Sequence, residues 1–202
     1  MNQTVQNSSN SSDVLQTILN RRSVKNVVSP GPSKEQVALA LQCATTAPDH
    51  GALRVWRFGF IEQPEIVSLG ERAIHVLETL GRPLSEEKAR RTRDWLKEVP
   101  LLVAMAYQMH HDNPKVPDVE QALSMGAAVM NFQNAMHAMG FASFWSTGLG
   151  TFTEEIPTEL GFDPLDYQFV GFLAVGTPRN EPAVRKPVDV SVIGRWCAPG
   201  EI

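Results

Sequence analysis

The sequence contains little cysteine, no long apolar run and no excess of positive charge. Its two cysteines, Cys43 and Cys197, are far apart and belong to no pairing motif, which excludes a disulfide-rich scaffold and favours a reducing cytoplasm. No apolar segment reaches the roughly 18 residues of a membrane-spanning helix. The net charge of −4 argues against nucleic acid or an anionic membrane as the main partner.

The composition that remains is typical of a single globular domain. Of the 202 residues, 43% are hydrophobic and 20% are charged, which is enough to build one sizeable core. We assign this domain to residues 13–202. Residues 1–12 are polar and lack the apolar centre of a signal peptide, so we expect a disordered extension there. After Pro178 the chain is rich in proline and valine without a core stripe of its own, which indicates a C-terminal arm.

The order of the predicted helices and strands favours an α+β fold. They are mixed without regular alternation or internal repeat, which argues against a doubly wound parallel sheet. Ser33 and Gln36 form a capping-box pattern at the start of the second helix, which runs to the break at Pro48. The other helices are predicted over 13–21, 64–80, 85–98, 118–139 and 154–160, and the strands over 56–62, 100–107, 141–146 and 167–175.

Two of these elements have an unusual apolar content. The strand at 100–107 is apolar along nearly its whole length, so we place it in the centre of the sheet. The helix at 118–139 has small or flexible apolar side chains around most of its circumference, and such a helix is normally buried. We therefore expect this helix at a contact between subunits, with its methionines acting as core filler.

A basic cluster follows the first predicted helix. Arg21, Arg22, Ser23 and Lys25 place two guanidinium groups, a hydroxyl and an amine within five residues. Guanidinium groups donate paired hydrogen bonds to phosphate oxygens, and a serine hydroxyl adds a third donor, so the cluster is a candidate phosphate site. Alternatively, a basic run at a helix end complements the helix dipole or stays solvated.

Four later segments, taken together with the basic cluster, indicate what kind of protein this is. They are Ala47-Pro48-Asp49-His50, the strand at 56–62, the segment from Gly140 to Gly148 and the segment from Val170 to Pro178. In this order and spacing, and together with the basic cluster, the chain resembles the nitroreductase family of FMN-dependent oxidoreductases from about residue 14 to residue 178. The resemblance implies helices flanking a central, mostly antiparallel sheet. It also implies an interlocked homodimer whose terminal segments embrace the partner, with FMN at the subunit interface.

The resemblance also implies roles for the basic cluster. Arg21 and Ser23 would hold the phosphate and ribityl chain of FMN, with Arg22 supporting them. Lys25 would lie beside the pyrimidine edge of the flavin, where a cation stabilises the negative charge that reduction places on the ring.

Residues from two further segments would complete the site. His50, with Thr46 behind it, would reach over from the second subunit. Trp145, Ser146 and Thr147 would form the opposite wall. Each of these also has a structural interpretation: His50 as the cap of a helix end, Trp145 as ordinary core, and Thr147 with the following glycine as a turn.

Two positions depart from the pattern of the family. Thr46 and Ser146 stand where relatives often carry basic residues, and Arg54 is placed to compensate in part. Each charged hydrogen bond to phosphate that is not replaced weakens binding by roughly 1–3 kcal/mol. The departures therefore bear on the affinity for FMN more than on the fold.

The function implied is an NAD(P)H-dependent flavin reductase. NADH or NADPH would deliver hydride to FMN, and a flat electron-poor acceptor such as a nitroaromatic or a quinone would take the electrons in a ping-pong reaction. Such chemistry requires no catalytic proton-transfer residue and no metal. The sequence His110-His111-Asp112 is the one local cluster with metal-binding residue types, but adjacent histidines project differently and no cysteine lies nearby. The alternatives are a flavin-binding or regulatory dimer with little turnover, and a different flavin reaction on an unknown metabolite.

Overall fold

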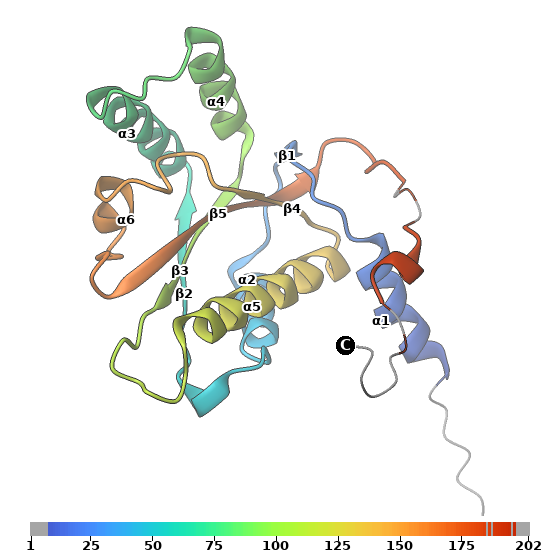
Figure 1. Cartoon of the computed structure of the whole chain (residues 1–202). Helices are drawn as coiled ribbons and strands as arrows, with labels where there is room; N and C mark the ends of the chain where they lie inside the picture. The colour runs from blue at the N-terminus through green and yellow to red at the C-terminus, as the bar shows by residue number, and fades with distance from the viewer. Residues whose placement is uncertain (1–7, 185, 187, 195, 197–202) are drawn as a thin grey trace, which may run out of the picture.

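A five-stranded sheet lies between two layers of helices (Figure 1). The structure is a computed structural model, and it describes residues 8–184, 186, 188–194 and 196. The helices are α1 (Ser8–Asn20), α2 (Lys34–Ala44), α3 (Glu65–Thr79), α4 (Glu86–Glu98), α5 (Asp118–Ala138) and α6 (Glu155–Glu159), with 3-10 turns η1 (His50–Ala52) and η2 (Val190–Val192). The strands are β1 (Val27–Val28), β2 (Trp56–Glu62), β3 (Leu101–Gln108), β4 (Ala142–Ser146) and β5 (Tyr167–Pro178).

All strand pairs between these five strands are antiparallel, and β5 holds most of them together. The strand order is β1-β5-β3-β2, and β4 pairs with β5 as well. Strand β3 lies between β5 and β2, as its apolar sequence predicts, and every residue from 101 to 107 is buried. The predicted α+β class with a central antiparallel sheet is therefore confirmed.

Strand β3 supplies side chains to both halves of the core. Leu101, Val103 and Met105 pack with α2 and α5, whereas Leu102 and Ala104 face α3 and α4. Successive side chains of a strand point to opposite faces, so a strand covered on both sides must be apolar throughout. This is why the central strand could be identified without a periodic pattern.

The predicted elements agree with the structure except at the N-terminal side. Ser33 caps α2 by accepting a hydrogen bond from the backbone N–H of Gln36, and the Gln36 side chain completes the capping box. Helix α1 begins at Ser8, so residues 8–12 of the segment expected to be disordered are helical, and residues 1–7 lie outside the described residues. A helix gains one hydrogen bond for each residue added, so it extends into polar sequence once it has started. The two-residue strand β1 was not predicted, since it is too short to show alternation.

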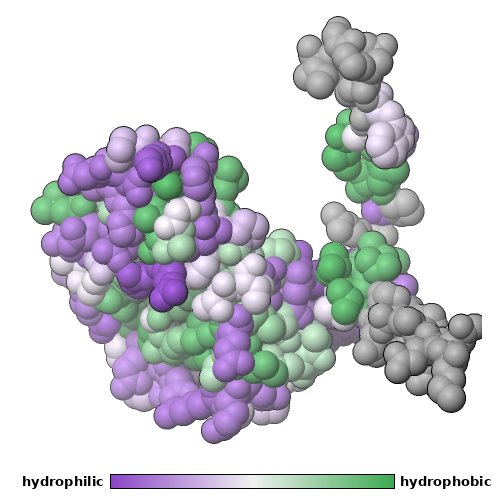
Figure 2. All heavy atoms as spheres, turned by 90° about the horizontal axis from the view of Figure 1, so that it is seen from below, coloured by the Kyte–Doolittle hydropathy of each residue, from purple (hydrophilic) through white to green (hydrophobic). Residues whose placement is uncertain are grey.

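Several described helices leave apolar side chains on the surface of the single chain. Helix α5 buries Met125 and Met136 but exposes Val119, Leu123 and Met130. The other exposed sets are Val14, Leu15, Ile18 and Leu19 on α1 and, in the C-terminal segment, Val184, Val188, Val190, Val192, Ile193 and Trp196. In Figure 2 a column of atoms, several of them green, projects from the body of the molecule. Within the described residues, none of the helices combines the length and the hydrophobicity that a bilayer crossing requires.

Gly171 is a point where β5 and β4 approach too closely for a side chain. Its φ is +117°, and a Cβ atom built there would lie 2.6 Å from the carbonyl oxygen of Ser146. We expect Gly171→Ala to lower the free energy of unfolding by about 2–4 kcal/mol, because the strained φ and the backbone clash add together. Urea denaturation measures this change.

Gly161→Ala is the matched control for this prediction. Gly161 also has a positive φ, +84°, but a Cβ atom at this position would meet no heavy atom within 4 Å among the described residues, so only the conformational cost applies. We expect a loss of about 1 kcal/mol there. Equal losses in the two variants would contradict a steric clash at Gly171.

Candidate functional site

The basic segment is attached to the start of strand β4. Ser23 forms an isolated parallel bridge with Ser143, and the backbone N–H of Val24 donates to the Ser143 carbonyl at 3.0 Å. The Ser143 hydroxyl is itself buried and accepts from the side-chain amide of Gln133 in α5 at 3.0 Å. The segment that follows α1 therefore has a fixed path along the sheet, and its side chains are presented beside β4.

Lys25 lies where three cavities meet. It lines one cavity with Arg22 and Ser23, and a second with Trp95 and Arg179. The third cavity, of about 430 Å³, is bordered by Lys25 and by Ser146, Thr147 and Gly148. Five of the predicted site residues are thus brought to connected hollows: Arg22, Ser23, Lys25, Ser146 and Thr147.

Trp95 of helix α4 holds Lys25 in this position. The Lys25 Nζ lies 5.4 Å from the centroid of the Trp95 ring, and the Trp95 Nε1–H donates to the Lys25 carbonyl at 2.9 Å. The ring also packs edge-on against Phe144, with centroids 6.3 Å apart. The sequence did not indicate a role for Trp95, which reads only as the apolar edge of a charged helix.

The loop after β4 forms one wall of the 430 Å³ cavity and is closed by its own hydroxyl groups. The Ser146 Oγ accepts from the backbone N–H of Gly148 at 3.2 Å, and the Thr151 hydroxyl donates to the Gly148 carbonyl at 2.6 Å. The Thr153 hydroxyl donates to the carbonyl of Gly150 at 2.8 Å. These local hydrogen bonds hold the turn in one shape, as is usual for serine and threonine in loops.

Trp145 does not line this cavity with its neighbours. Adjacent side chains of a strand point to opposite faces, so Phe144 and Ser146 face the cavity and Trp145 faces away. Its indole N–H donates to the Val170 carbonyl at 2.9 Å. In the single chain the wall is therefore built from Phe144, Ser146 and Thr147.

His50 lies far from the basic cluster of the same chain, and Thr46 lies at an intermediate position along helix α5. The His50 Nδ1 is 2.5 Å from the Glu120 carboxylate, near the N-terminal end of α5, and the Asn131 side chain donates to the Thr46 hydroxyl at 3.1 Å. Arg21 and Arg22 lie instead near His137, at the C-terminal end of α5. Glu120 and His137 are roughly 25 Å apart along the helix, at 1.5 Å per residue.

The side chain of Arg22 has a local structural role at the end of α1. The Arg22 Nη1 donates to the carbonyls of Leu19 and Arg21 at 2.6 and 2.8 Å, so this side chain closes the C-terminal end of the helix. Its Nε is buried and has no hydrogen-bond partner among the described residues. Burial, together with the positive charges of Arg21 and Arg22, lowers the pKa of His137.

Comparison with known proteins places the chain in a family. The sequence profile of the Nitroreductase family matches residues 18–177. A protein of Escherichia coli (strain K12), named "Putative NAD(P)H nitroreductase YdjA", is 32% identical over 169 residues, which cover 83% of this chain and 89% of that protein.

Solved structures share the fold at lower sequence identity. A nitroreductase-like family protein from Bacillus cereus superposes with a TM-score of 0.75 at 17% identity, covering 98% of both chains. A protein from Desulfovibrio desulfuricans, solved in complex with FMN, superposes with a TM-score of 0.70 at 19% identity, covering 92% of this chain and 98% of that one. The profile match and the identity to the E. coli protein show that the chain belongs to the nitroreductase family.

Proposed function

We propose that this protein is an FMN-dependent homodimeric oxidoreductase that passes hydride equivalents from NADH or NADPH to flat, electron-poor acceptors such as nitroaromatics and quinones. Membership of the nitroreductase family supports the general activity. The observation that carries the proposal for this chain is the position of Lys25. It connects the hollow beside Arg22 and Ser23 with the cavity beside Ser146 and Thr147.

The residues around Lys25 fit the two ends of FMN. Arg21, Arg22 and Ser23 supply donors for a phosphate, and an anion would provide the acceptor that the buried Nε of Arg22 lacks among the described residues. Burying a donor without a partner is unfavourable, so an acceptor at this point would stabilise the site. Among the described residues that line the Lys25–Ser146 cavity, aromatic and hydroxyl-bearing side chains suit a flat heterocycle.

Lys25 would have an electrostatic role. Bound FMN would supply the hydride chemistry. An ammonium group fixed beside its pyrimidine edge would stabilise the negative charge of the reduced ring without rearranging, since Trp95 already contacts both the ammonium group and the backbone carbonyl of Lys25. NAD(P)H and the acceptor would use the same cavity in turn, so ping-pong kinetics are expected.

The site would be completed by a second subunit. His50 lies near one end of α5 and Arg21 near the other, so one cofactor could contact both only if they came from different chains. The exposed apolar side chains Val119, Leu123 and Met130 on α5 suit a subunit contact, because large apolar patches are rarely left in water. The α1 helix and the apolar C-terminal segment would embrace the partner.

The visible spectrum tests the activity directly. We expect the purified protein to carry, or to take up, yellow FMN, and to bleach anaerobically on addition of NADH or NADPH. Subsequent addition of a nitroaromatic or a quinone should restore the colour. A yellow protein that ignores both nicotinamides would favour a flavin-binding dimer with little turnover, and a protein that cannot be reconstituted with FMN would refute the proposal.

Mixed dimers test whether the site is shared. Arg21→Gln should weaken FMN binding about 10- to 100-fold, because a hydrogen bond to a charged group is worth roughly 1.5–3 kcal/mol. His50→Gln should weaken it less. When the two variants are co-expressed and the mixed dimer is separated from the two homodimers, each mixed dimer should contain one doubly altered site and one wild-type site. Half of the sites of the mixed dimer should therefore recover wild-type affinity in a fluorescence titration with FMN.

Arg21→Gln co-expressed with Ser23→Ala is the control pair. Both residues belong to one segment, so every site of that mixed dimer carries one altered residue and no wild-type affinity should return. Recovery in the control, or its absence in the first pair, would contradict a site built from two chains.

The histidine near Arg21 reports on the proposed phosphate position. Because the pKa of His137 is lowered, the folded protein binds fewer protons than the unfolded chain below the ordinary histidine pKa of about 6.5. Stability from neutral His137 is therefore complete above that pH and is lost as the pH falls toward the lowered pKa. Arg21→Gln removes one cation, so the pKa of His137 should rise and the melting temperature should fall less between pH 7 and 5.

Proton NMR of the imidazole and calorimetry measure these two effects. His137→Gln should lack the same portion of the pH dependence, which assigns it to this residue. FMN bound with its phosphate at Arg21 should also raise the pKa of His137. An unchanged titration in both Arg21→Gln and the FMN-loaded protein would place the phosphate elsewhere.

A further inference from the structure

The described lining of the cavity beside Lys25 contains cations and no carboxylate. Three of these lining residues are positively charged, namely Lys25, Arg82 and Lys88, and none is aspartate or glutamate. The whole chain has a net charge of −4, so this hollow differs in sign from the protein around it. Such a cavity attracts anionic ligands because neighbouring like charges add their fields.

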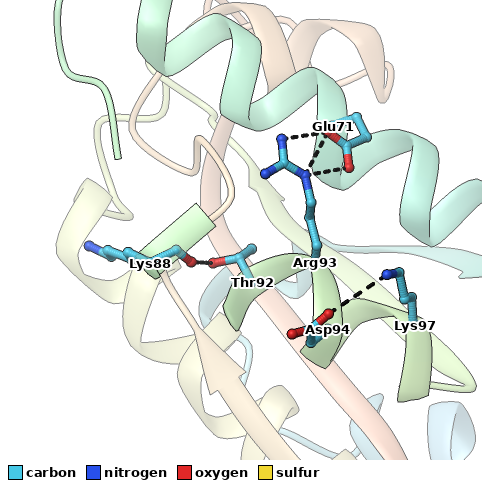
Figure 3. A network of polar contacts seen from close by, with 6 residues as sticks. All are labelled: Glu71, Lys88, Thr92, Arg93, Asp94 and Lys97. Atoms are coloured by element: carbon cyan, nitrogen blue, oxygen red, sulfur yellow. Dashed lines mark hydrogen bonds and ion pairs between the residues drawn. The ribbon is translucent and has the colours of Figure 1, made fainter. Parts of the chain in front are cut away.

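Lys88 differs from the other cations of helix α4 in having no ionic partner among the described residues. Arg90 and Lys97 pair with Asp94 at 3.3 and 3.7 Å, and Arg93 forms a bidentate pair with Glu71 at 2.7–3.0 Å. Arg91 pairs with Glu87 at 2.7 Å. Figure 3 shows the ammonium group of Lys88 directed away from the cluster of Glu71, Arg93, Asp94 and Lys97. The Lys88 charge is therefore available to the cavity.

Arg82 lies on the loop between α3 and α4 and, like Lys88, has no ionic partner among the described residues. Within the described part of the chain, the Arg82 guanidinium has no ion pair or side-chain hydrogen bond, although its backbone N–H donates to the Leu77 carbonyl at 2.8 Å. Both Arg82 and Lys88 are exposed at the α3–α4 side of the cavity. Thr92, one turn after Lys88, has its hydroxyl turned back to the Lys88 carbonyl at 2.8 Å.

The remaining lining is largely apolar and aromatic. Trp95, Phe144 and Phe152 line the cavity, and Phe152 has 75% of its surface exposed. Ile74, Leu77 and Leu84 add aliphatic surface from the α3–α4 hairpin. Aromatic walls with cations at one side suit a flat ring that bears a negative substituent.

We propose that Arg82 and Lys88 bind the carboxylate of an aromatic electron acceptor, so that the reductase prefers anionic aromatic acceptors to neutral ones of the same shape. This inference rests on the function proposed above. Guanidinium donors match carboxylate geometry, and Lys88 adds a point charge.

Paired substrates and matched variants test the proposal. The wild-type FMN-loaded enzyme should show a lower KM for 4-nitrobenzoate than for the neutral 4-nitrobenzamide. The double variant Arg82→Gln/Lys88→Gln should raise the KM for 4-nitrobenzoate about 5- to 10-fold, the size expected for two exposed charge pairs, with little change for 4-nitrobenzamide. Added NaCl should reduce the wild-type preference, because salt screens exposed charges.

Arg90→Gln/Lys97→Gln is the control, since it also removes two positive charges from α4, but from residues that pair with Asp94 and do not line the cavity. It should leave both KM values unchanged. Equal KM values for the two substrates in the wild type, or equal effects of the two double variants, would overturn the proposal. A raised KM for NADPH with an unchanged KM for 4-nitrobenzoate would also overturn it, by assigning the cations to coenzyme phosphate.

A binding measurement separates this inference from the proposed function. If neither acceptor is reduced while FMN is bound, the reductase function fails. Calorimetric titration of the FMN-loaded protein with 4-nitrobenzoate then still decides whether the two cations bind the carboxylate. Weaker binding in Arg82→Gln/Lys88→Gln but not in Arg90→Gln/Lys97→Gln supports the subsite, and the same binding in both overturns it.

Discussion

The candidate site depends on the attachment of the Arg21–Lys25 segment to strand β4. One backbone hydrogen bond from Val24 to Ser143 and the adjoining bridge at Ser23 join the N-terminal part of the chain to a strand more than a hundred residues later. Strand β4 is in turn held by β5 along its whole length. Because β4 ends at Ser146 and leads directly into the loop that follows, the same strand positions the basic segment and the opposite wall of the cavity.

Helix α5 is the second element that positions the residues of the site. Its buried side packs on the sheet through Met125, Phe132 and Met136, while Gln133 donates to the serine that receives the basic segment. The exposed side of α5 presents apolar residues with His50 near one end and Arg21 near the other. One helix thus links the core, the attachment of the basic segment and the surface we assign to the partner subunit.

Much of the fold could be predicted because short sequence patterns indicated where several helices and strands begin, end or are buried. The capping box at Ser33, the break at Pro48 and the apolar run from 101 to 107 each have a direct physical effect on the backbone or on burial. The grouping of Ser23 with Ser146, and the role of Trp95, had no such signal. Trp95 looks like one aromatic residue in a charged helix, and only its packing against Lys25 and Phe144 gives it importance.

The sequence by itself determined the helices, the central strand, the residue types of the basic cluster and the likeness to the nitroreductases, because these depend on composition and spacing along the chain. The tertiary structure alone decided which side chains share a cavity. It turned Trp145 away from Ser146, separated His50 from Arg21 and, within the described part of the chain, left Lys88 without the ionic partners that its neighbours on α4 have. These outcomes depend on strand alternation, helix length and contacts between distant segments, which become definite only when the chain is folded.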